Sequence, residues 1–327
     1  MAEYISFQPS DFFKTLLYSG NGTAIGSGGN VITGVGFQSD MTWCKTYDAT
    51  ANHALYDAVR GVEKVVYPNT TDAEGVATEG LTAWGADGFT VGSDGDVNNG
   101  SREYVAWNWK AGTTTGIAGS PSITPASYSF NQTSGFSILK YEGSGATATL
   151  PHGLGVAPDM IITKEIEAPG GGNDWGIYHS ALGNTKAIWL NTTAAAGTSS
   201  TYWNDTSPTP TLFTVSTNTQ SNGSSTDYVA YCFAEKKGYS KFGGYTGNGN
   251  VDGTFIYTGF RPACLIIKMV TGGSDNDWHI FDNKREGYNV DNDGLLPNST
   301  AAEDTADAID LLSNGFKCRI ATGDVNN

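Results

Sequence analysis

Two acidic groupings are the first candidates for chemistry in this chain. Glu165 and Glu167 stand beside a loop rich in Pro and Gly, and paired carboxylates are the catalytic groups of most glycosidases. Their spacing does not fix the distance between the two carboxyl groups, so a solvated loop edge is the favoured interpretation. The run Asp94-Gly-Asp-Val-Asn98 begins like a calcium loop but lacks the Gly at the sixth place and the Glu at the twelfth. This favours an Asx turn over a cation site.

Other catalytic motifs are missing from the sequence. It has no phosphate-binding P-loop, no nucleophile elbow, no zinc-ligand spacing and no dinucleotide fingerprint after a strand. Four cysteines lie in apolar strand contexts, and we expect them to be reduced and buried. They are Cys44, Cys232, Cys264 and Cys318. We therefore predict no catalytic residue, no cofactor and no metal site, in a protein that is not an enzyme.

The elements that would position any site belong to an internal repeat. Each of three copies has a Tyr before a Gly-x-Gly-type turn, then a strand ending in Lys, a short aromatic strand, and a strand built around Phe. The landmarks are Tyr18, Tyr141 and Tyr245; Lys45, Lys164 and Lys268; Tyr56, Tyr178 and Phe281; and Phe89, Phe213 and Phe316. The separations from first to last landmark are 71, 72 and 71 residues, a regularity that scattered aromatics would not produce.

The third copy of the repeat is incomplete. In the first two copies an apolar strand follows the landmark Phe by 15 residues, at 104–109 and 228–233. The same count from Phe316 passes the last residue, and the final run 323–327 is identical to 95–99. We expect that the gene continues, or that another segment or subunit supplies the missing strand.

The repeat also argues against a catalytic histidine. His53 shares its repeat position with Trp175 and Trp278, and His179 replaces an aspartate that the other two copies have. A catalytic group would not be exchanged between copies in this way.

One insertion in the second copy is the candidate binding site. Most tryptophans recur at equivalent positions, as residues that fill the same core do, but Trp203 has no counterpart in the other copies. With Tyr202, Asn204 and Asp205 it would form an exposed group on a turn that stacks on and hydrogen-bonds a sugar. The alternative is that Trp203 packs against a neighbouring module or subunit.

The composition of the chain favours sheets joined by many turns. Glycine accounts for 43 of 327 residues, aromatics for 12% and charged residues for only 16%. The formal net charge of −15 opposes a nucleic-acid surface and adhesion to anionic membranes. The start of the sequence lacks the basic and apolar segments of a secretory signal, and no apolar run approaches a membrane span. We expect a protein made in a cytosol, without membrane insertion.

The predicted fold is all-β, with tandem β-sandwich modules, the third of which lacks its last strand. The predicted boundaries are 1–112 for the first module, 113–235 for a linker and the second module, and 236–327 for the third. The run 228–233 is apolar throughout, which predicts a central strand covered on both faces. Helices should be rare, and the segments 305–313 and 78–84 are each expected to form at most a short turn of helix.

Several motifs together carry a resemblance to a known family. They are Phe7-Gln-Pro-Ser-Asp-Phe-Phe13, Leu17-Tyr-Ser-Gly-Asn-Gly22, Gly34-Val-Gly-Phe37, Tyr104-Val-Ala-Trp107, Tyr228-Val-Ala-Tyr-Cys-Phe-Ala-Glu235, Tyr245-Thr-Gly-Asn-Gly249 and Asp310-Leu-Leu-Ser-Asn-Gly-Phe316. In combination they resemble a repeat family of tailed-phage virion proteins, usually called tail-fibre or LamG-like jelly-roll proteins, which are common in marine and freshwater phages including cyanophages. The resemblance covers nearly the whole chain. Family members finish the last module with an aromatic strand ending in Ala-Phe-Ala-Glu, which this chain lacks.

The resemblance implies jelly-roll or concanavalin-like sandwich modules and a virion structural role, and it supplies no catalytic residues. We expect a bacteriophage tail-fibre or appendage subunit that takes part in host adhesion, made in the host cytoplasm and located in the virion. The expected partners are further copies of the chain in a homotrimer, other virion proteins and a host-surface glycan, but not nucleic acid. The alternatives are a capsid decoration (cement) protein and, as an enzyme, a surface-polysaccharide depolymerase.

Overall fold

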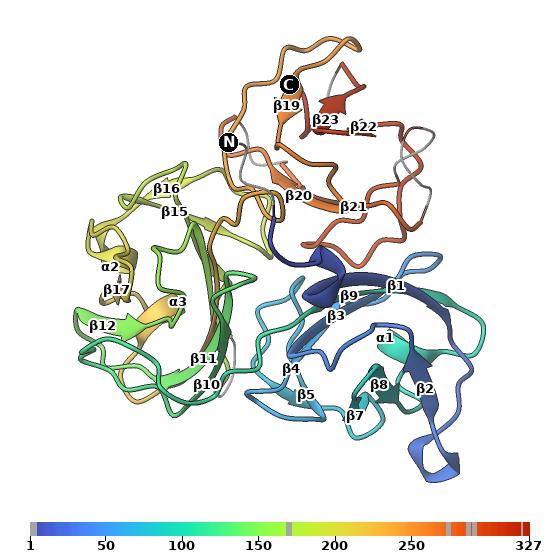
Figure 1. Cartoon of the computed structure of the whole chain (residues 1–327), viewed down its shortest axis with the longest axis horizontal. Helices are drawn as coiled ribbons and strands as arrows, with labels where there is room; N and C mark the ends of the chain where they lie inside the picture. Colours follow the sequence, from blue (N-terminus) through green and yellow to red (C-terminus); the bar gives the residue numbers. More distant parts are fainter. Residues whose placement is uncertain (1–4, 168–171, 273–275, 286–288, 290–292, 322) are drawn as a thin grey trace.

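The computed structural model describes residues 5–167, 172–272, 276–285, 289, 293–321 and 323–327. Strands make up 36% of the chain and helices 6%, which confirms the predicted all-β fold. Figure 1 shows three lobes arranged around a common centre, with the first unit in blue to cyan, the second in green to yellow and the third in orange to red. No helix within the described residues is long and apolar enough to cross a membrane.

The first unit is a sandwich of two antiparallel sheets. Its elements are η1 (Pro9–Asp11), β1 (Phe13–Ser19), η2 (Ile25–Ser27), β2 (Asn30–Thr33), β3 (Met41–Thr46), β4 (Ala54–Asp57), β5 (Lys64–Val65), β6 (Gly75–Val76), β7 (Leu81–Gly85), β8 (Gly88–Val91), α1 (Gly95–Asn98) and β9 (Glu103–Trp109). The sheet β1-β9-β3-β4 packs on the sheet β2-β8-β7, and β5 pairs with β6. Apolar side chains from both sheets, including Ile32, Tyr56, Phe89 and Ala106, fill the space between them.

The second unit repeats this arrangement. Its elements are β10 (Ser127–Asn131), β11 (Phe136–Glu142), β12 (Ala148–Pro151), β13 (Met160–Glu165), β14 (Gly176–His179), β15 (Lys186–Trp189), β16 (Gly197–Thr198), α2 (Ser200–Trp203), β17 (Leu212–Val215), α3 (Thr219–Asn222) and β18 (Asp227–Phe233). A sheet of order β10-β11-β18-β13-β14-β15-β16 packs on the pair β12-β17.

The third unit has fewer strands. Its elements are β19 (Phe255–Tyr257), β20 (Cys264–Lys268), β21 (Trp278–Asp282), β22 (Ile309–Leu312) and β23 (Gly315–Cys318). They form the sheet β19-β23-β22 and the pair β20-β21, with a core between them that includes Ile267, Phe281, Leu311 and Phe316.

The strands β9 and β18 are each buried on both faces. In β9, Ala106 points into the sandwich of its own unit while Trp107 points into a core shared by all three units. In β18, Ala230 likewise points into the sandwich of the second unit, and Tyr231 points into the shared core. Alternate residues of a strand face opposite sides of the sheet, so a strand with cores on both sides carries apolar residues on both of its faces. The expectation for 228–233 is therefore confirmed.

Equivalent hydrogen bonds recur around the landmark tyrosines. Each tyrosine hydroxyl donates to a main-chain carbonyl near a buried Asn: Tyr18 to Val97 at 2.8 Å, Tyr141 to Ser221 at 2.6 Å and Tyr245 to Val325 at 2.7 Å. The adjacent Asn98, Asn222 and Asn326 each accept from the amide of a Gly-x-Gly-type turn and donate to a carbonyl six residues before them. One local structure is thus built three times.

Two segments that were expected to be short turns of helix are strands instead. In 305–313 the strand β22 pairs with β23 through a turn at Ser313 and Asn314, and in 78–84 the strand β7 begins at Leu81. Ile309 and Leu311 are buried in the third core, and this two-residue period is that of a strand. The helix expectation is wrong because pairing across a hairpin satisfies the backbone and buries the apolar residues, and tertiary context overrides local propensity.

Candidate functional site

The units meet through contacts that repeat in one cyclic order, from first to third, third to second and second to first. The residue at one repeat position donates a hydrogen bond from its ring nitrogen to a main-chain carbonyl of the next unit. The bonds run from His53 Nε2 to Leu296 at 3.0 Å, from Trp278 Nε1 to Trp189 at 2.8 Å and from Trp175 Nε1 to Tyr67 at 3.2 Å. The landmark lysines do the same: Lys45 to Thr300 at 3.4 Å, Lys268 to Thr192 at 3.4 Å and Lys164 to Thr71 at 2.8 Å. Three equivalent interfaces therefore close a ring with pseudo-threefold symmetry (Figure 1).

The interface lysines are held by main-chain oxygens, and Lys45 and Lys164 are fully buried whereas Lys268 is partly buried. Burial lowers the pKa of Lys45, Lys164 and Lys268 to about 8 each. Within its own unit, Lys45 also donates to the Thr46 carbonyl at 2.7 Å, and Lys164 donates to Asn173 at 2.7 Å. Because the acceptors of each ammonium group come from both sides of an interface, these lysines tie neighbouring units together.

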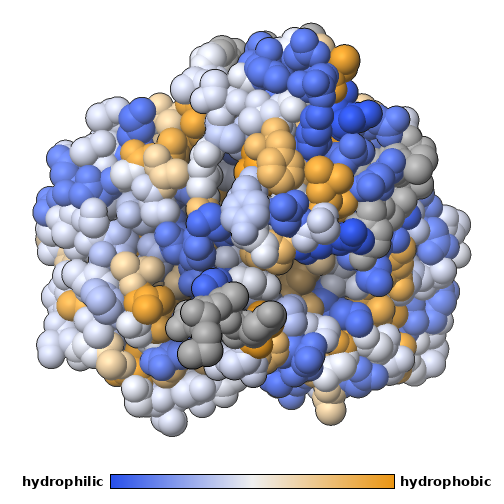
Figure 2. Space-filling model, turned by 45° about the horizontal axis from the view of Figure 1, so that its top comes forward, coloured by the Kyte–Doolittle hydropathy of each residue, from blue (hydrophilic) through white to orange (hydrophobic). Residues whose placement is uncertain are grey.

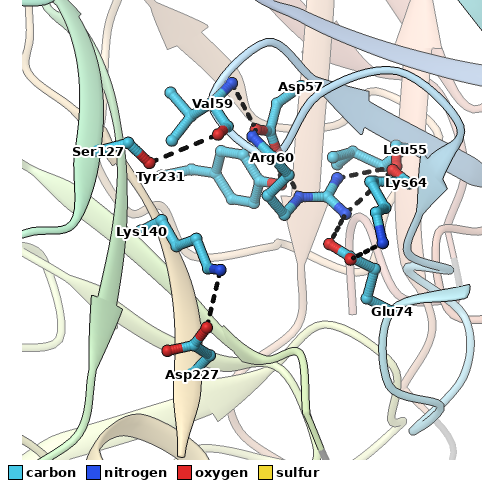
Figure 3. Close-up of polar contacts among 10 residues, drawn as sticks. All are labelled: Leu55, Asp57, Val59, Arg60, Lys64, Glu74, Ser127, Lys140, Asp227 and Tyr231. Carbon is cyan, nitrogen blue, oxygen red and sulfur yellow. Dashed lines mark hydrogen bonds and ion pairs between the residues drawn. The ribbon is translucent and has the colours of Figure 1, made fainter.

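A buried ionic cluster lies where the second unit contacts the first (Figure 3). Arg60 Nε donates to Asp57 Oδ2 at 2.5 Å, and one terminal nitrogen of Arg60 lies 3.2 Å from Glu74 Oε2. The Arg60 and Asp57 side chains are 1% and 0% exposed. From the second unit, the Tyr231 hydroxyl donates to the same Asp57 oxygen at 2.7 Å. Burial opposes the Arg60 cation, but the Asp57 carboxylate outweighs it and holds the pKa of the guanidinium above its ordinary value.

The same cluster recurs where the first unit contacts the third. Arg285 Nε donates to Asp282 Oδ2 at 2.9 Å, and Arg285 also pairs with Glu303 at 2.8 Å. The donor from the neighbouring unit is Trp107 Nε1, at 3.2 Å from Asp282 Oδ2. Trp107 occupies in β9 the position that Tyr231 occupies in β18. Each central strand thus sends one polar aromatic across an interface to an aspartate.

Among its described residues, the second unit has no such cluster. At the positions of Asp57, Arg60 and Glu74 it carries His179, Leu182 and Ala196. The Ala196 amide keeps the main-chain bond to the next unit, at 3.0 Å from the Val270 carbonyl, just as Glu74 bonds to Ile166 at 3.2 Å. Burial lowers the pKa of His179, so this position is neutral where the other units hold an ion pair.

The two ionic clusters are suited to holding structure rather than to catalysis. Both oxygens of Asp57 are used by protein donors, namely Arg60, Tyr231 and the amides of Val59 and Arg60. A fully enclosed carboxylate with all its partners in place offers no atom to a substrate. Removal of one partner from such a cluster is costly, because it leaves a buried charge uncompensated.

The predicted sugar-binding group is not arranged as expected. Trp203 is 1% exposed, and Tyr202 is also buried, in the core of the second unit. Trp203 Nε1 donates to the Lys186 carbonyl at 3.1 Å, and its ring meets the edge of Tyr178 at 5.9 Å. The exposed ring predicted at Trp203 is therefore wrong, and so is the alternative of packing against a neighbouring module, because all these contacts lie within the second unit.

Asn204 and Asp205 are exposed, and both have positive φ angles, 52° and 48°. They form the tight turn that ends α2, a role for which Asn and Asp tolerate the left-handed conformation. Exposed aromatic rings that can stack on a sugar lie instead on β19 of the third unit, at Phe255 and Tyr257, the latter 66% exposed.

The remaining acidic candidates have structural roles. Asp94 caps α1 by accepting from the Asp96 amide at 2.9 Å, as an Asx turn does. Glu165 accepts from Asn173, and Glu167 accepts from the Asp227 amide at 3.3 Å. Among the described residues, no group of three His, Cys, Asp or Glu side chains is placed to hold a metal ion. The four cysteines are unpaired thiols, as expected, and Cys264 is less buried than the other three.

A cavity of about 1130 Å³ lies between the third unit and the centre of the ring. Its walls include the segment 238–247, the strand β20 and the turn 324–327, together with His179 and Leu182 of the second unit. Figure 2 shows hydrophobic patches above and beside the hollow in the middle of that face, whereas the top of the upper lobe is mainly hydrophilic.

Comparison with known proteins gives one match. The model of the family described as Domain of unknown function (DUF7483) matches residues 8–327. The chain belongs to this family. No curated protein matches the chain, and no solved structure matches it.

Sequence reasoning did not find the ionic clusters or the cavity. A signal for the clusters was present, because Asp57 and Asp282 are each followed three residues later by an arginine, at Arg60 and Arg285. The third member of each cluster was hidden, because it lies 14 residues after the arginine in the first unit and 18 residues after it in the third. The contacts of these residues with a neighbouring unit become visible only in the folded structure, where the three units close into a ring.

Proposed function

We propose that this chain is a bacteriophage virion structural protein, a tail-fibre or related appendage subunit that presents its sandwich modules toward the host surface. The resemblance of its repeat motifs to tailed-phage virion proteins supports this role. The observation that carries the proposal is the closed ring, in which three sandwiches share one apolar core and every interface buries hydrogen-bonded or charged groups. Large apolar interfaces between domains make a rigid body, which suits a part that transmits force and does not turn over substrate.

The pseudo-threefold arrangement supports a place on a threefold-symmetric structure. A body with three equivalent faces around an axis can bind a trimeric partner through the same contacts three times. The proposed partners are further copies of the chain in a homotrimer and other virion proteins. Light scattering of the purified chain measures its oligomeric state. A homotrimer predicts three times the mass of one chain, and a stable monomer would contradict it.

The location in the particle separates the proposal from its alternatives. Mass spectrometry of purified particles and gold-labelled antibody against the chain should find it at the tail. Label over the capsid lattice would replace the tail assignment by that of a decoration protein, and absence from particles would refute a virion role.

The enzyme alternative has its own test. A depolymerase needs an acidic pair in an open groove, whereas the most buried carboxylates of this chain, Asp57 and Asp282, are held by arginines. Incubation of the protein with host polysaccharide should release no new reducing ends. Sustained release would show that the protein is an enzyme.

A further inference from the structure

The third unit lacks, within its described residues, the central strand of the other two. In the first unit β9 lies between β1 and β3, and in the second β18 lies between β11 and β13. The counterparts of the flanking strands in the third unit are the segment 240–246 and β20. β20 pairs with β21 along one edge, and 240–246 has only an isolated bridge at Ser240. Both segments line the same cavity, and among the described residues no strand pairs with the edge of β20 that faces away from β21; we call this part of the cavity the slot.

The residues that line the slot are less covered than their counterparts. Ile266 in the middle of β20 is 36% exposed, whereas the equivalent Ile162 in β13 is 8% exposed and Trp43 in β3 is 3% exposed. The cavity of about 1130 Å³ has both β20 and 240–246 in its wall. Unpaired strand edges beside an apolar floor are a template for another strand.

We propose that this slot binds a seven-residue β-strand of the β9 and β18 type, supplied by polypeptide outside residues 1–327. The strand pairs antiparallel with both 240–246 and β20. The chemistry of the occupant follows from what β9 and β18 share: an acidic first residue, Tyr, Val and Ala next, and aromatics at the fifth and seventh places. A strand with cores on both faces needs this continuous apolar run.

The third unit contains the main-chain groups that would bind the hydroxyl of the Tyr at the second place. In β9 the Tyr104 hydroxyl accepts from the Asn99 amide at 2.7 Å and donates to the Gly95 carbonyl at 2.8 Å. In β18 the Tyr228 hydroxyl makes the equivalent bonds with Gly223 and Thr219. The corresponding groups of the third unit are the amide of Asn327 and the carbonyl of Gly323, in a run whose sequence is identical to 95–99.

The aromatic at the fifth place follows from the cyclic order of the ring. Trp107 of the first unit reaches Asp282 of the third, and Tyr231 of the second reaches Asp57 of the first. The strand in the third unit must then reach the second unit, where His179 stands at the aspartate position and lines the cavity. Leu182 beside it replaces the arginine of the other clusters, so this site accepts an apolar ring without an ion pair.

The aromatic at the seventh place would complete an aromatic cluster against the core that the three units share. Trp109 and Phe233 hold this place in β9 and β18, and their ring centroids are 6.4 Å apart. Both residues also line the cavity. A third ring from the bound strand would lie beside them and continue the established interface.

A synthetic peptide with the sequence of residues 100–109 tests the proposal on the intact chain. Fluorescence anisotropy should show saturable binding of one peptide per chain, and hydrogen exchange of the β20 amides should slow by at least about tenfold on binding. A matched peptide with proline at the Val and Ala positions should bind at least about tenfold more weakly, because proline cannot donate to the ladder. Equal binding of both peptides, or unchanged exchange in 264–268, would overturn the proposal.

Two protein variants control for the site of binding. Ile266→Lys places a charge on the floor of the slot at a partly exposed position, so it should abolish peptide binding and leave the melting temperature nearly unchanged. Phe255→Lys on the outer face of β19 should leave binding intact. Peptide binding by the Ile266 variant as tight as by the unchanged chain would show that the peptide binds elsewhere and would overturn the proposal.

A second copy of the chain is the competing occupant. If the purified chain is a dimer whose β20 amides are already protected, the second copy fills the slot and the proposal is wrong. A chain with residues 100–109 appended after Asn327 provides a further check, because its melting temperature should rise by at least about 5 °C as the slot is filled. None of these measurements needs a phage particle, so their outcome is independent of the proposed virion role.

Discussion

The ionic cluster at Asp57 offers a quantitative test of how the ring is held together. The change is Arg60→Leu, which removes a guanidinium whose side chain is 1% exposed and which pairs with both Asp57 and Glu74. Breaking a buried ion pair by removing one partner costs about 3–5 kcal/mol, because the remaining charge stays buried without compensation. The free energy of unfolding should therefore fall by about that amount.

The second unit supplies a matched control for this variant. Its cluster positions hold His179, Leu182 and Ala196, so the triple change Asp57→His, Arg60→Leu and Glu74→Ala copies a solution that the protein already uses. Replacement of a whole buried ion cluster by residues that pack well is often nearly neutral. We expect the triple variant to lose less than about 2 kcal/mol and to be more stable than the Arg60→Leu variant.

Urea unfolding followed by tryptophan fluorescence measures both variants, provided that the denaturant slope is unchanged. If the triple variant is less stable than the single variant, the ionic cluster makes a net contribution to stability. In that case our inference that neutral residues can replace the whole cluster is wrong. If Arg60→Leu costs less than about 1 kcal/mol, the group is not buried as the structure shows.

Further predictions concern single positions. Trp203→Ala should lower the stability by about 3–5 kcal/mol as a core truncation, whereas Tyr257→Ala should leave the melting temperature unchanged; similar melting of the two variants would contradict the burial of Trp203. Asn222→Ala removes bonds to the Ser144 amide and the Ser216 carbonyl and should cost about 2–4 kcal/mol by thermal unfolding, with a near-zero change refuting the shared turn structure. Burial lowers the pKa of His152 from 6.5 to about 4, so its contribution to stability is complete above pH 6.5 and is lost as the pH falls toward 4, by up to about 3 kcal/mol. His152→Gln should flatten the stability profile between pH 6.5 and 4, and an unchanged profile would show that His152 does not titrate there.

The repeated part of the fold was accessible from the sequence, because each module needs the same residues for the same contacts. The landmarks Tyr18, Tyr141 and Tyr245 mark one hydrogen-bonded turn in all three units, and their spacing was visible without coordinates. The apolar run 228–233 likewise predicted a strand with a core on each face, since no other environment hides every one of its side chains.

The ring itself was not accessible, because its contacts join residues far apart in the chain. The bond from Lys45 to Thr300 spans 255 residues, and no local pattern encodes such a partner. The repeat position shared by His53, Trp175 and Trp278 was visible in the sequence, but its role as a hydrogen-bond donor across an interface depends on ring closure.

The prediction at Trp203 failed for a related reason. The absence of a counterpart in the other copies suggests a residue that is free for recognition, but a sandwich with a local insertion must also fill a local gap. The α2 segment brings Trp203 over Tyr178, where burial of a large ring stabilises the second unit. A residue that occurs in only one copy of a repeat can therefore serve either local packing or recognition, and the exposure of its side chain decides between the two.

A reconstruction of the phage particle at near-atomic resolution tests the central proposal most directly. The account predicts a three-lobed body on the tail, matching the ring of Figure 1, with contacts to other virion proteins. The absence of such a body from the tail, or its presence on the capsid lattice alone, would contradict the assignment of this chain as a tail appendage protein.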